Sequence, residues 1–144
     1  MYGLKITNGD LAVMGDGNCV LVTGRERLVQ EISHWLLEPL GTDSLYNRFG
    51  STLDQIIGSP MLPEYMAEVR SEVGRVLQNY MAYQTRRMNE DRLKGEDVFL
   101  RNWSDEDIVD VLDGISVKAV ADTLKVTVKL TTVAGTKLTI ERTL

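Results

Sequence analysis

The side chains that most readily perform chemistry are scarce in this sequence, which has one histidine, His34, and one cysteine, Cys19. A nucleophilic triad needs histidine as its base, and no Gly-x-Ser-x-Gly turn accompanies His34. Cys19 lies in a predicted strand without a visible activating group. One histidine and one cysteine are also too few for a zinc site without several carboxylates. We therefore interpret His34 as an ordinary residue of an amphipathic helix.

Carboxylates are plentiful, with 21 Asp and Glu residues. Glycoside hydrolysis needs only two placed carboxyl groups, and Glu26, Glu31, Glu38 and Asp43 lie near one another in the sequence. Nothing in the sequence separates a proton-donating acid among them from a surface charge. A peptidoglycan-cleaving lysozyme that uses Glu26 and Glu38 stays open as the enzyme alternative.

Two acidic segments resemble cation sites only loosely. The run Gly15-Asp16-Gly17-Asn18 lacks the remaining ligands of a calcium loop and is typical of a hairpin turn. The acidic residues of segment 105–113 are better explained by helix capping and a solvated face. The sequence thus predicts no catalytic, metal-binding or cofactor-binding residues and no enzyme activity.

The composition indicates one globular domain over residues 1–144, with 43% hydrophobic and 26% charged residues. A formal net charge of −5 argues against nucleic acid as a partner, although basic residues gather at Arg86, Arg87, Arg92 and Lys94. The N-terminus lacks a signal-peptide pattern, and no apolar run approaches the ~18 residues that cross a bilayer. We expect no membrane partner, no intrachain disulfide and synthesis in a reducing cytoplasm.

The first half of the chain predicts strands followed by helices. Segment 1–22 is typical of a β-meander with turns at Asn8-Gly9 and at 15–18. Segment 23–90 is the predicted helical part, and its first helix runs from a capping box of Thr23 and Glu26 to about Leu37. A brief helical turn is expected at 53–57.

The second main helix is the longest predicted element, about 27 residues or ~40 Å after Pro63. Apolar residues recur along it in alternating steps of four and three, a pattern of core packing or of a coiled-coil seam with another subunit. These residues are Leu62, Met66, Val69, Val73, Val76, Tyr80 and Tyr83.

The C-terminal part, 104–144, predicts a short third helix and an antiparallel sheet. Segment 89–103 is polar and expected to be irregular, and Ser104 can cap a helix through Val111. Strands are expected at 115–121, 124–133 and 137–144, with one buried and one solvated face. The fold class is therefore α+β, in a single domain.

The segment Leu36–Leu53 runs from a helix end through Pro39-Leu40-Gly41-Thr42-Asp43 to Arg48-Phe49-Gly50-Ser51. It resembles the baseplate wedge proteins that initiate the tail sheath of contractile phages. This family is sometimes labelled lysozyme-like and is related to a component of type VI secretion baseplates. The segment's helix end, Gly-containing turn and Phe-Gly-Ser element stand in the family's order, and the order of elements matches over roughly residues 18–144. The family motif loop comprises Pro39, Gly41, Arg48, Phe49, Gly50 and Ser51.

One part of the chain departs from the family pattern. Members usually carry a Glu-Pro-Arg motif after the second helix, and only the arginine of Gln84-Thr85-Arg86 matches it here. By resemblance, the candidate wedge-core contacts are Tyr83, Gln84, Thr85, Arg86 and Arg87. The physical reading of the loop agrees with a scaffold: Gly50 permits a tight turn, Phe49 plugs the core and Ser51 caps the next helical turn.

The resemblance implies a structural protein of the virion's tail baseplate that starts sheath polymerisation by strand addition to its C-terminal β-hairpin. Its implied partners are the tail sheath protein and other wedge, hub and tube proteins, in several copies of a six-fold assembly. We expect deletion of 137–144 to leave baseplates without sheath. The candidate sheath-docking residues are Lys125, Val126, Val128, Leu130, Lys137, Leu138, Ile140 and Arg142.

A third class of function also stays open beside the wedge protein and the lysozyme. A bacterial anti-adaptor shares the family's fold, so the chain could be a soluble regulatory adaptor. That hypothesis predicts a stable monomer with a single protein partner, whereas a wedge protein should co-purify with several.

Overall fold

The structure is a computed structural model that describes residues 1–56, 63–121 and 123–144. Over these residues the fold is α+β, as predicted, with four helices, small N-terminal strands and a C-terminal antiparallel sheet. The elements are β1 (Tyr2–Leu4), β2 (Ile6–Thr7), β3 (Asp10–Leu11), β4 (Leu21–Thr23), α1 (Gly24–Leu37), α2 (Leu53–Ile56), α3 (Pro63–Lys94), α4 (Glu96–Asn102), β5 (Val109–Val120), β6 (Thr123–Thr132) and β7 (Lys137–Thr143).

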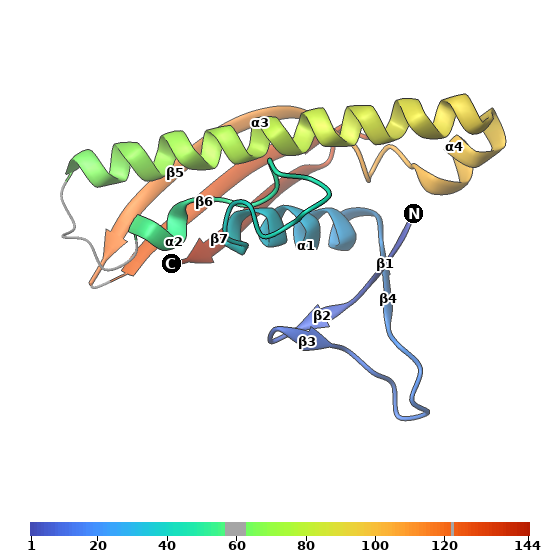
Figure 1. The fold of residues 1–144 in the computed structure, drawn as a ribbon, viewed down its shortest axis with the longest axis horizontal. Helices are drawn as coiled ribbons and strands as arrows, with labels where there is room; N and C mark the ends of the chain where they lie inside the picture. Colours follow the sequence, from blue (N-terminus) through green and yellow to red (C-terminus); the bar gives the residue numbers. More distant parts are fainter. Residues whose placement is uncertain (57–62, 122) are drawn as a thin grey trace.

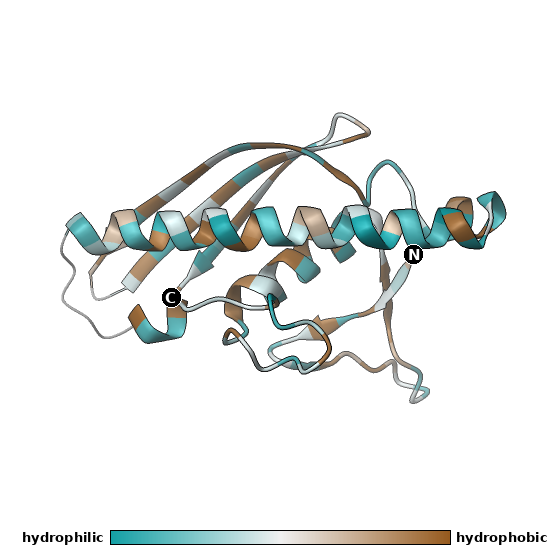
Figure 2. Ribbon diagram, turned by 45° about the horizontal axis from the view of Figure 1, so that its top comes forward, coloured by the Kyte–Doolittle hydropathy of each residue, from teal (hydrophilic) through white to brown (hydrophobic). Residues whose placement is uncertain are grey.

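The C-terminal sheet and the two main helices form the body of the molecule (Figure 1). The strand order is β5-β6-β7, so β6 is central and pairs on both sides. α3 packs along β5, and α1 lies near β7. Apolar residues alternate with polar ones along the strands (Figure 2), and the apolar set of β6 and β7 is buried on one face, as predicted.

The apolar stripe of α3 belongs to the core of this chain. Val69, Val73, Val76 and Tyr80 are at most 1% exposed and pack with residues of α1 and the sheet. The coiled-coil reading is therefore wrong for these positions, because another subunit cannot reach side chains that the chain already covers. Leu62, at the start of the predicted stripe, and Ile57 and Asp122 lie outside the described residues.

The predicted helix at 104–111 is wrong, as is the irregular segment at 89–103. α3 continues to Lys94, Gly95 turns the chain with a φ of +134°, and α4 follows immediately. Asp107 does accept hydrogen bonds from Ser104, but these close a single turn. From Val109 onward the chain pairs with β6, where β-branched residues pack well.

The N-terminal strands form an arm that extends away from the body (Figure 1). β2 and β3 make the predicted hairpin, with Asn8 and Gly9 at φ +54° and +83°, as a type I′ turn requires. β1 pairs with β4, which brings both ends of the arm to the start of α1. The predicted capping box does not form, because Thr23 makes no side-chain cap and Glu26 bonds Lys5.

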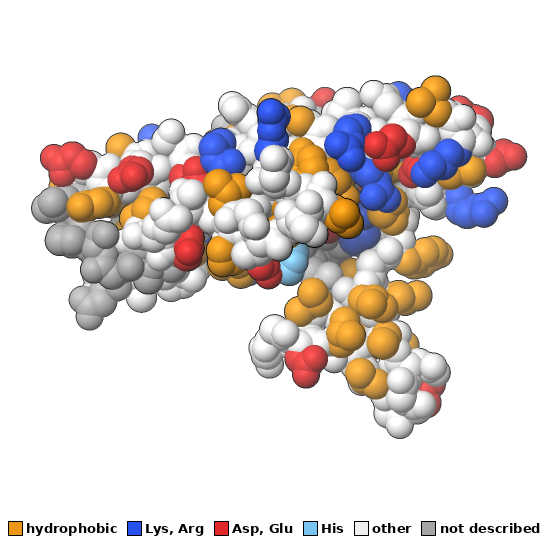
Figure 3. Space-filling model, in the orientation of Figure 1, with side chains coloured by type: hydrophobic (Ala, Val, Ile, Leu, Met, Phe, Trp, Pro, Cys, Tyr) orange, Lys and Arg blue, Asp and Glu red, His pale blue; other side chains and the backbone are white. Residues whose placement is uncertain are grey.

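The arm carries an unusual share of exposed apolar side chains, visible in Figure 3. Seven of them are 42–71% exposed, namely Tyr2, Leu4, Ile6, Leu11, Val13, Met14 and Leu21. A contiguous apolar surface of this kind is typical of a region that contacts another protein. Within the described residues, no helix has the length and apolar character needed to cross a membrane.

Candidate functional site

The family motif loop is closed at its neck by a parallel bridge between Pro39 and Ser51. The backbone N–H of Leu40 donates to the Ser51 carbonyl, and the Ser51 N–H donates to the Glu38 carbonyl, both at 2.8 Å. Ser51 Oγ also donates to the Leu36 carbonyl at 2.7 Å and accepts from the N–H of Leu53. Ser51 therefore joins the end of α1 to the start of α2, which includes its predicted capping role.

Gly50 sits where the loop passes closest to the chain of α1. Its φ is +93°, and a Cβ at this position would lie 2.6 Å from the Glu38 carbonyl oxygen. Arg75 of α3 donates to the Gly50 carbonyl at 3.2 Å and to the Glu72 carboxylate at 2.7 Å. The hydrogen bond from Arg75 holds the pKa of Glu72 below its ordinary value. The loop is thus fastened to α3 as well as to α1.

Aromatic packing fills the space under the loop. The Phe49 ring lies edge-on to Trp35 with 4.9 Å between centroids, and Tyr46 lies 5.2 Å from Tyr83. Phe49 plugs the core as predicted. Gly41 and Arg48 instead lie exposed on the outer part of the loop. The motif residues therefore divide into a structural neck and an exposed rim.

The candidate wedge-core contacts on α3 fall into two groups. Gln84 is 3% exposed, donates to the Asp107 carbonyl at 2.6 Å and accepts from the Val109 N–H, so it is not available to a partner. Thr85 and Arg86 are exposed, while Tyr83 and Arg87 are partly buried. The surface offered here is basic and aromatic, because Arg86 lies over the Tyr46 ring and Arg87 over the Tyr83 ring.

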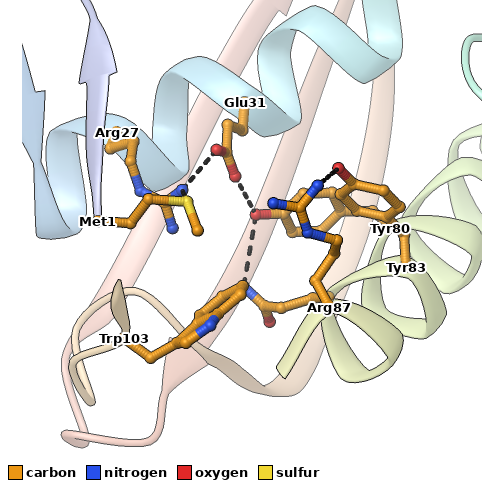
Figure 4. Close-up of a pocket in the computed structure, with 8 residues that line it drawn as sticks. Met1, Arg27, Glu31, Tyr80, Tyr83, Arg87 and Trp103 are labelled. Carbon is orange, nitrogen blue, oxygen red and sulfur yellow. Dashed lines mark hydrogen bonds and ion pairs between the residues drawn. The ribbon is translucent and has the colours of Figure 1, made fainter. Parts of the chain in front are cut away.

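Beneath this surface lies a buried polar network that the sequence analysis missed (Figure 4). Arg27 is 2% exposed and donates to Asp107 at 3.2 Å and to Glu31 at 2.6 Å. Tyr80 donates to the other oxygen of Glu31 at 2.8 Å. Burial, and then the nearby Glu31 carboxylate, raise the pKa of Tyr80 well above its ordinary value. Arg27 and Glu31 are an (i, i+4) pair on α1, but Tyr80 and Asp107 come from distant parts of the chain, and no local pattern marks their part in the network.

A second buried carboxylate, Asp91, organises the turn between α3 and α4. It accepts hydrogen bonds from Lys94 at 3.0 Å, from Asn102 at 3.1 Å and from the Trp103 indole at 3.0 Å. These bonds, led by the one from Lys94, lower the pKa of Asp91 to about 2. Asp91 therefore stays ionised and serves as an anchor.

The candidate sheath-docking residues lie on two strands with different access. Lys125, Val126, Val128 and Leu130 belong to β6, whose backbone pairs with β5 on one side and β7 on the other. Another strand cannot add to β6, and its Val126 and Val128 pack in the core beneath the sheet, as expected. β7, with Lys137, Leu138, Ile140 and Arg142, is an edge strand.

The free edge of β7 can be assigned residue by residue. Leu124 and Leu144 exchange both backbone hydrogen bonds. Because such pairs alternate along an antiparallel ladder, the N–H and C=O groups of Lys137, Thr139, Glu141 and Thr143 point away from β6. Leu138 and Ile140 pack into the core at 2% exposure and hold the strand in place.

Arg142 is the one charged residue of β7 that faces the helices. Its Nη1 donates to the Glu141 carbonyl at 3.1 Å, and its Nη2 donates to Ser33 Oγ on α1. Its Nε is buried and has no hydrogen-bond partner among the residues that the structure describes. The side chain therefore covers one acceptor of the free edge. Next to it lies a groove of about 500 Å³ between α1, the β2–β3 hairpin and the end of β7.

The residues considered for chemistry are scattered. His34 and Cys19 are exposed and lie on α1 and on the arm. Glu26 and Glu38 are 12 positions apart along α1, about 18 Å at ~1.5 Å per residue, whereas glycosidase carboxyl pairs stand about 5–9.5 Å apart. In the acidic segment Asp105, Asp110 and Asp113 are exposed, as predicted for a solvated face, whereas Asp107 is buried against Arg27. Among the described residues no group of three metal-ligating side chains occurs.

None of the known protein-family models matches this chain. A comparison with curated proteins likewise finds no significant match.

Proposed function

We propose that this chain is a structural protein of the baseplate wedge in a contractile tail, where the free edge of β7 receives a strand from the first ring of tail sheath subunits. The observation that carries the proposal is the β7 edge, with Thr139 and Glu141 pointing their backbone groups outward from a strand anchored by core residues. Edge strands of this kind pair readily with another chain. The resemblance of Leu36–Leu53 to sheath initiators supports the same proposal.

The proposed work of the rest of the molecule is to hold this edge within a larger assembly. The closed loop at 39–51 and the basic, aromatic surface around Arg86 are rigid, because both are fastened to α1 and α3. The apolar arm offers a second surface for other wedge, hub or tube proteins. Several copies in a six-fold baseplate would place several β7 edges in a ring for the sheath.

Substitutions on the edge test strand addition better than deletion of 137–144, because that deletion also removes Leu138 and Ile140 from the core. Thr139→Pro removes an outward N–H and leaves the ladder to β6 unchanged. We expect baseplates with T139P to lack sheath in electron micrographs, whereas T139A, which keeps the N–H, should assemble normally.

A matched control uses the opposite edge of the same sheet. Ala119 of β5 pairs with Leu124, whose own backbone bonds go to Leu144, so the Ala119 N–H also points outward. A119P should leave sheath assembly unchanged. Normal sheaths on T139P baseplates would overturn the proposal. Loss of sheath with A119P alone would show that the sheath docks on β5 instead of β7.

The two alternatives make different predictions. A lysozyme should clear cell-wall suspensions in an activity that E26Q or E38Q abolishes, and the separation of these carboxylates along α1 disfavours that pair. A regulatory adaptor should purify with a single partner protein, whereas we expect several baseplate proteins to accompany the tagged chain from infected cells. Capture of one partner alone would favour the adaptor.

A further inference from the structure

The groove beside β7 is lined by two cationic side chains, Lys5 and Arg142, and by His34. Lys5 lies 2.7 Å from Glu26, and His34 lies 3.7 Å from Glu38. Arg142 differs, because its hydrogen bonds in the described part of the chain go to neutral oxygens, the Glu141 carbonyl and Ser33 Oγ. Glu26 and Glu38 also line the groove, but Arg142 makes no ion pair in the described part of the chain.

The surroundings of Arg142 suit a carboxylate. Its buried Nε finds no hydrogen-bond partner within residues 1–56, 63–121 and 123–144, and an unsatisfied buried donor is costly. Arginine presents its Nε–H and Nη–H groups as a planar fork that matches a carboxylate in two parallel hydrogen bonds. Both Arg142 and the groove lie at the edge where strand addition is proposed.

We propose that the groove recognises an acidic side chain on the strand that pairs with β7, and that Arg142 binds the carboxylate of this side chain. The inference rests on the proposed function, since the strand enters at the same edge. The carboxylate binds Nε together with Nη2, the two nitrogens on the same side of the guanidinium, and the incoming backbone N–H takes over the Glu141 carbonyl from Nη1. Arg142 thus covers the edge in the free protein and engages the partner in the complex.

The geometry also defines the sequence pattern of the partner strand. Residues that face the same side of a sheet are two positions apart, so the neighbours of the acidic residue at −2 and +2 face the helices with it. Leu37 and Val29 of α1 line that part of the groove. The expected partner is an extended segment with one acidic residue flanked at these positions by apolar residues.

The test measures binding of the full-length chain to the purified sheath subunit of the same tail at low and high salt. We expect R142Q to weaken binding about tenfold or more and to remove most of the salt dependence of binding. R142K should retain part of the affinity and part of the salt dependence. K118Q is the matched control, because Lys118 is an exposed cation on β5, the opposite edge strand of the sheet, and it should change binding less than about twofold.

The outcomes separate this inference from the proposed function. If T139P abolishes binding while R142Q binds as wild type with the same salt dependence, strand addition stands and acidic recognition is overturned. If T139P binds normally, both are overturned. Thermal unfolding of each variant checks folding. Should R142Q fail to fold, wild-type binding that is independent of salt would refute the inference by itself.

Discussion

Arg27 and Asp107 lie 80 positions apart in the chain, yet Nε of one donates to the carboxylate of the other at 3.2 Å, and both residues are at most 2% exposed. This pair joins α1 to the turn that precedes β5. It therefore ties the first half of the molecule to the sheet that carries the docking edge.

Removing the acidic partner should be strongly destabilising. Asp107→Ala leaves a buried guanidinium with Glu31 alone and frees the Ser104 turn, so we expect a loss of about 3 kcal/mol in the free energy of unfolding. Asp105→Ala, at an exposed position two residues away, should change it by less than about 0.5 kcal/mol. Urea denaturation of both variants measures the difference, and similar midpoints would contradict the role of the pair.

Alanine substitutions at two loop glycines with positive φ distinguish the stability cost of backbone strain from the cost of steric overlap. Gly41→Ala, at a φ of +86° with no atom within 4 Å of its Cβ, should cost about 1–2 kcal/mol through conformation alone. Gly50→Ala adds a contact of 2.6 Å with the Glu38 carbonyl, so it should cost clearly more. Chemical denaturation compares the two. Equal losses would show that the neck of the loop opens without cost.

The lowered pKa of Asp91 predicts a specific pH dependence of the protein's stability. Its pKa is lowered from 3.8 to about 2, so its ionised form stabilises the folded state above the unfolded pKa. That contribution is lost as the pH falls from about 4 towards about 2. Wild type should melt at a higher temperature than Asp91→Asn at pH 6, and the gap should narrow over this range. A gap that stays constant down to pH 2 would count against the lowered pKa.

Neighbouring residues of β7 should differ sharply in their effect on stability. Leu138 is 2% exposed, so Leu138→Ala should cost about 2–5 kcal/mol, as other buried leucines do. Thr139→Ala, on the solvated face, should cost less than about 0.5 kcal/mol. Calorimetry of the two variants tests this assignment. The same contrast explains why deletion of the whole strand cannot separate docking from folding.

Much of the fold could be predicted because it depends on local patterns. The strict alternation of Val126 and Val128 with polar neighbours predicted the sheet, and the stripe from Val69 to Tyr80 predicted α3. The Asn8-Gly9 turn and the tight conformation of Gly50 follow from backbone sterics alone. Each of these features is determined within a few residues of the chain.

The remainder depends on contacts that the sequence does not display. The local sequence of segment 104–111 predicts a capped helix, but the pairing of Val109 with β6 overrides that local preference. Gln84 was placed at a partner surface, whereas the turn at Asp107 buries it. The groove beside Arg142 likewise needs Ser33, which lies 109 positions away. Only the three-dimensional fold brings such residues together.

The sheet also sets the order in which the chain can fold on the ribosome. β5 to β7 span residues 109–143 and are synthesised after α1 and α3, whose apolar stripes pack against them. At ~5–20 residues per second, translation of this segment takes about two to seven seconds. During that time the stripes of both helices have no sheet to cover them, and a chaperone that shields nascent apolar helices would raise the yield of native protein.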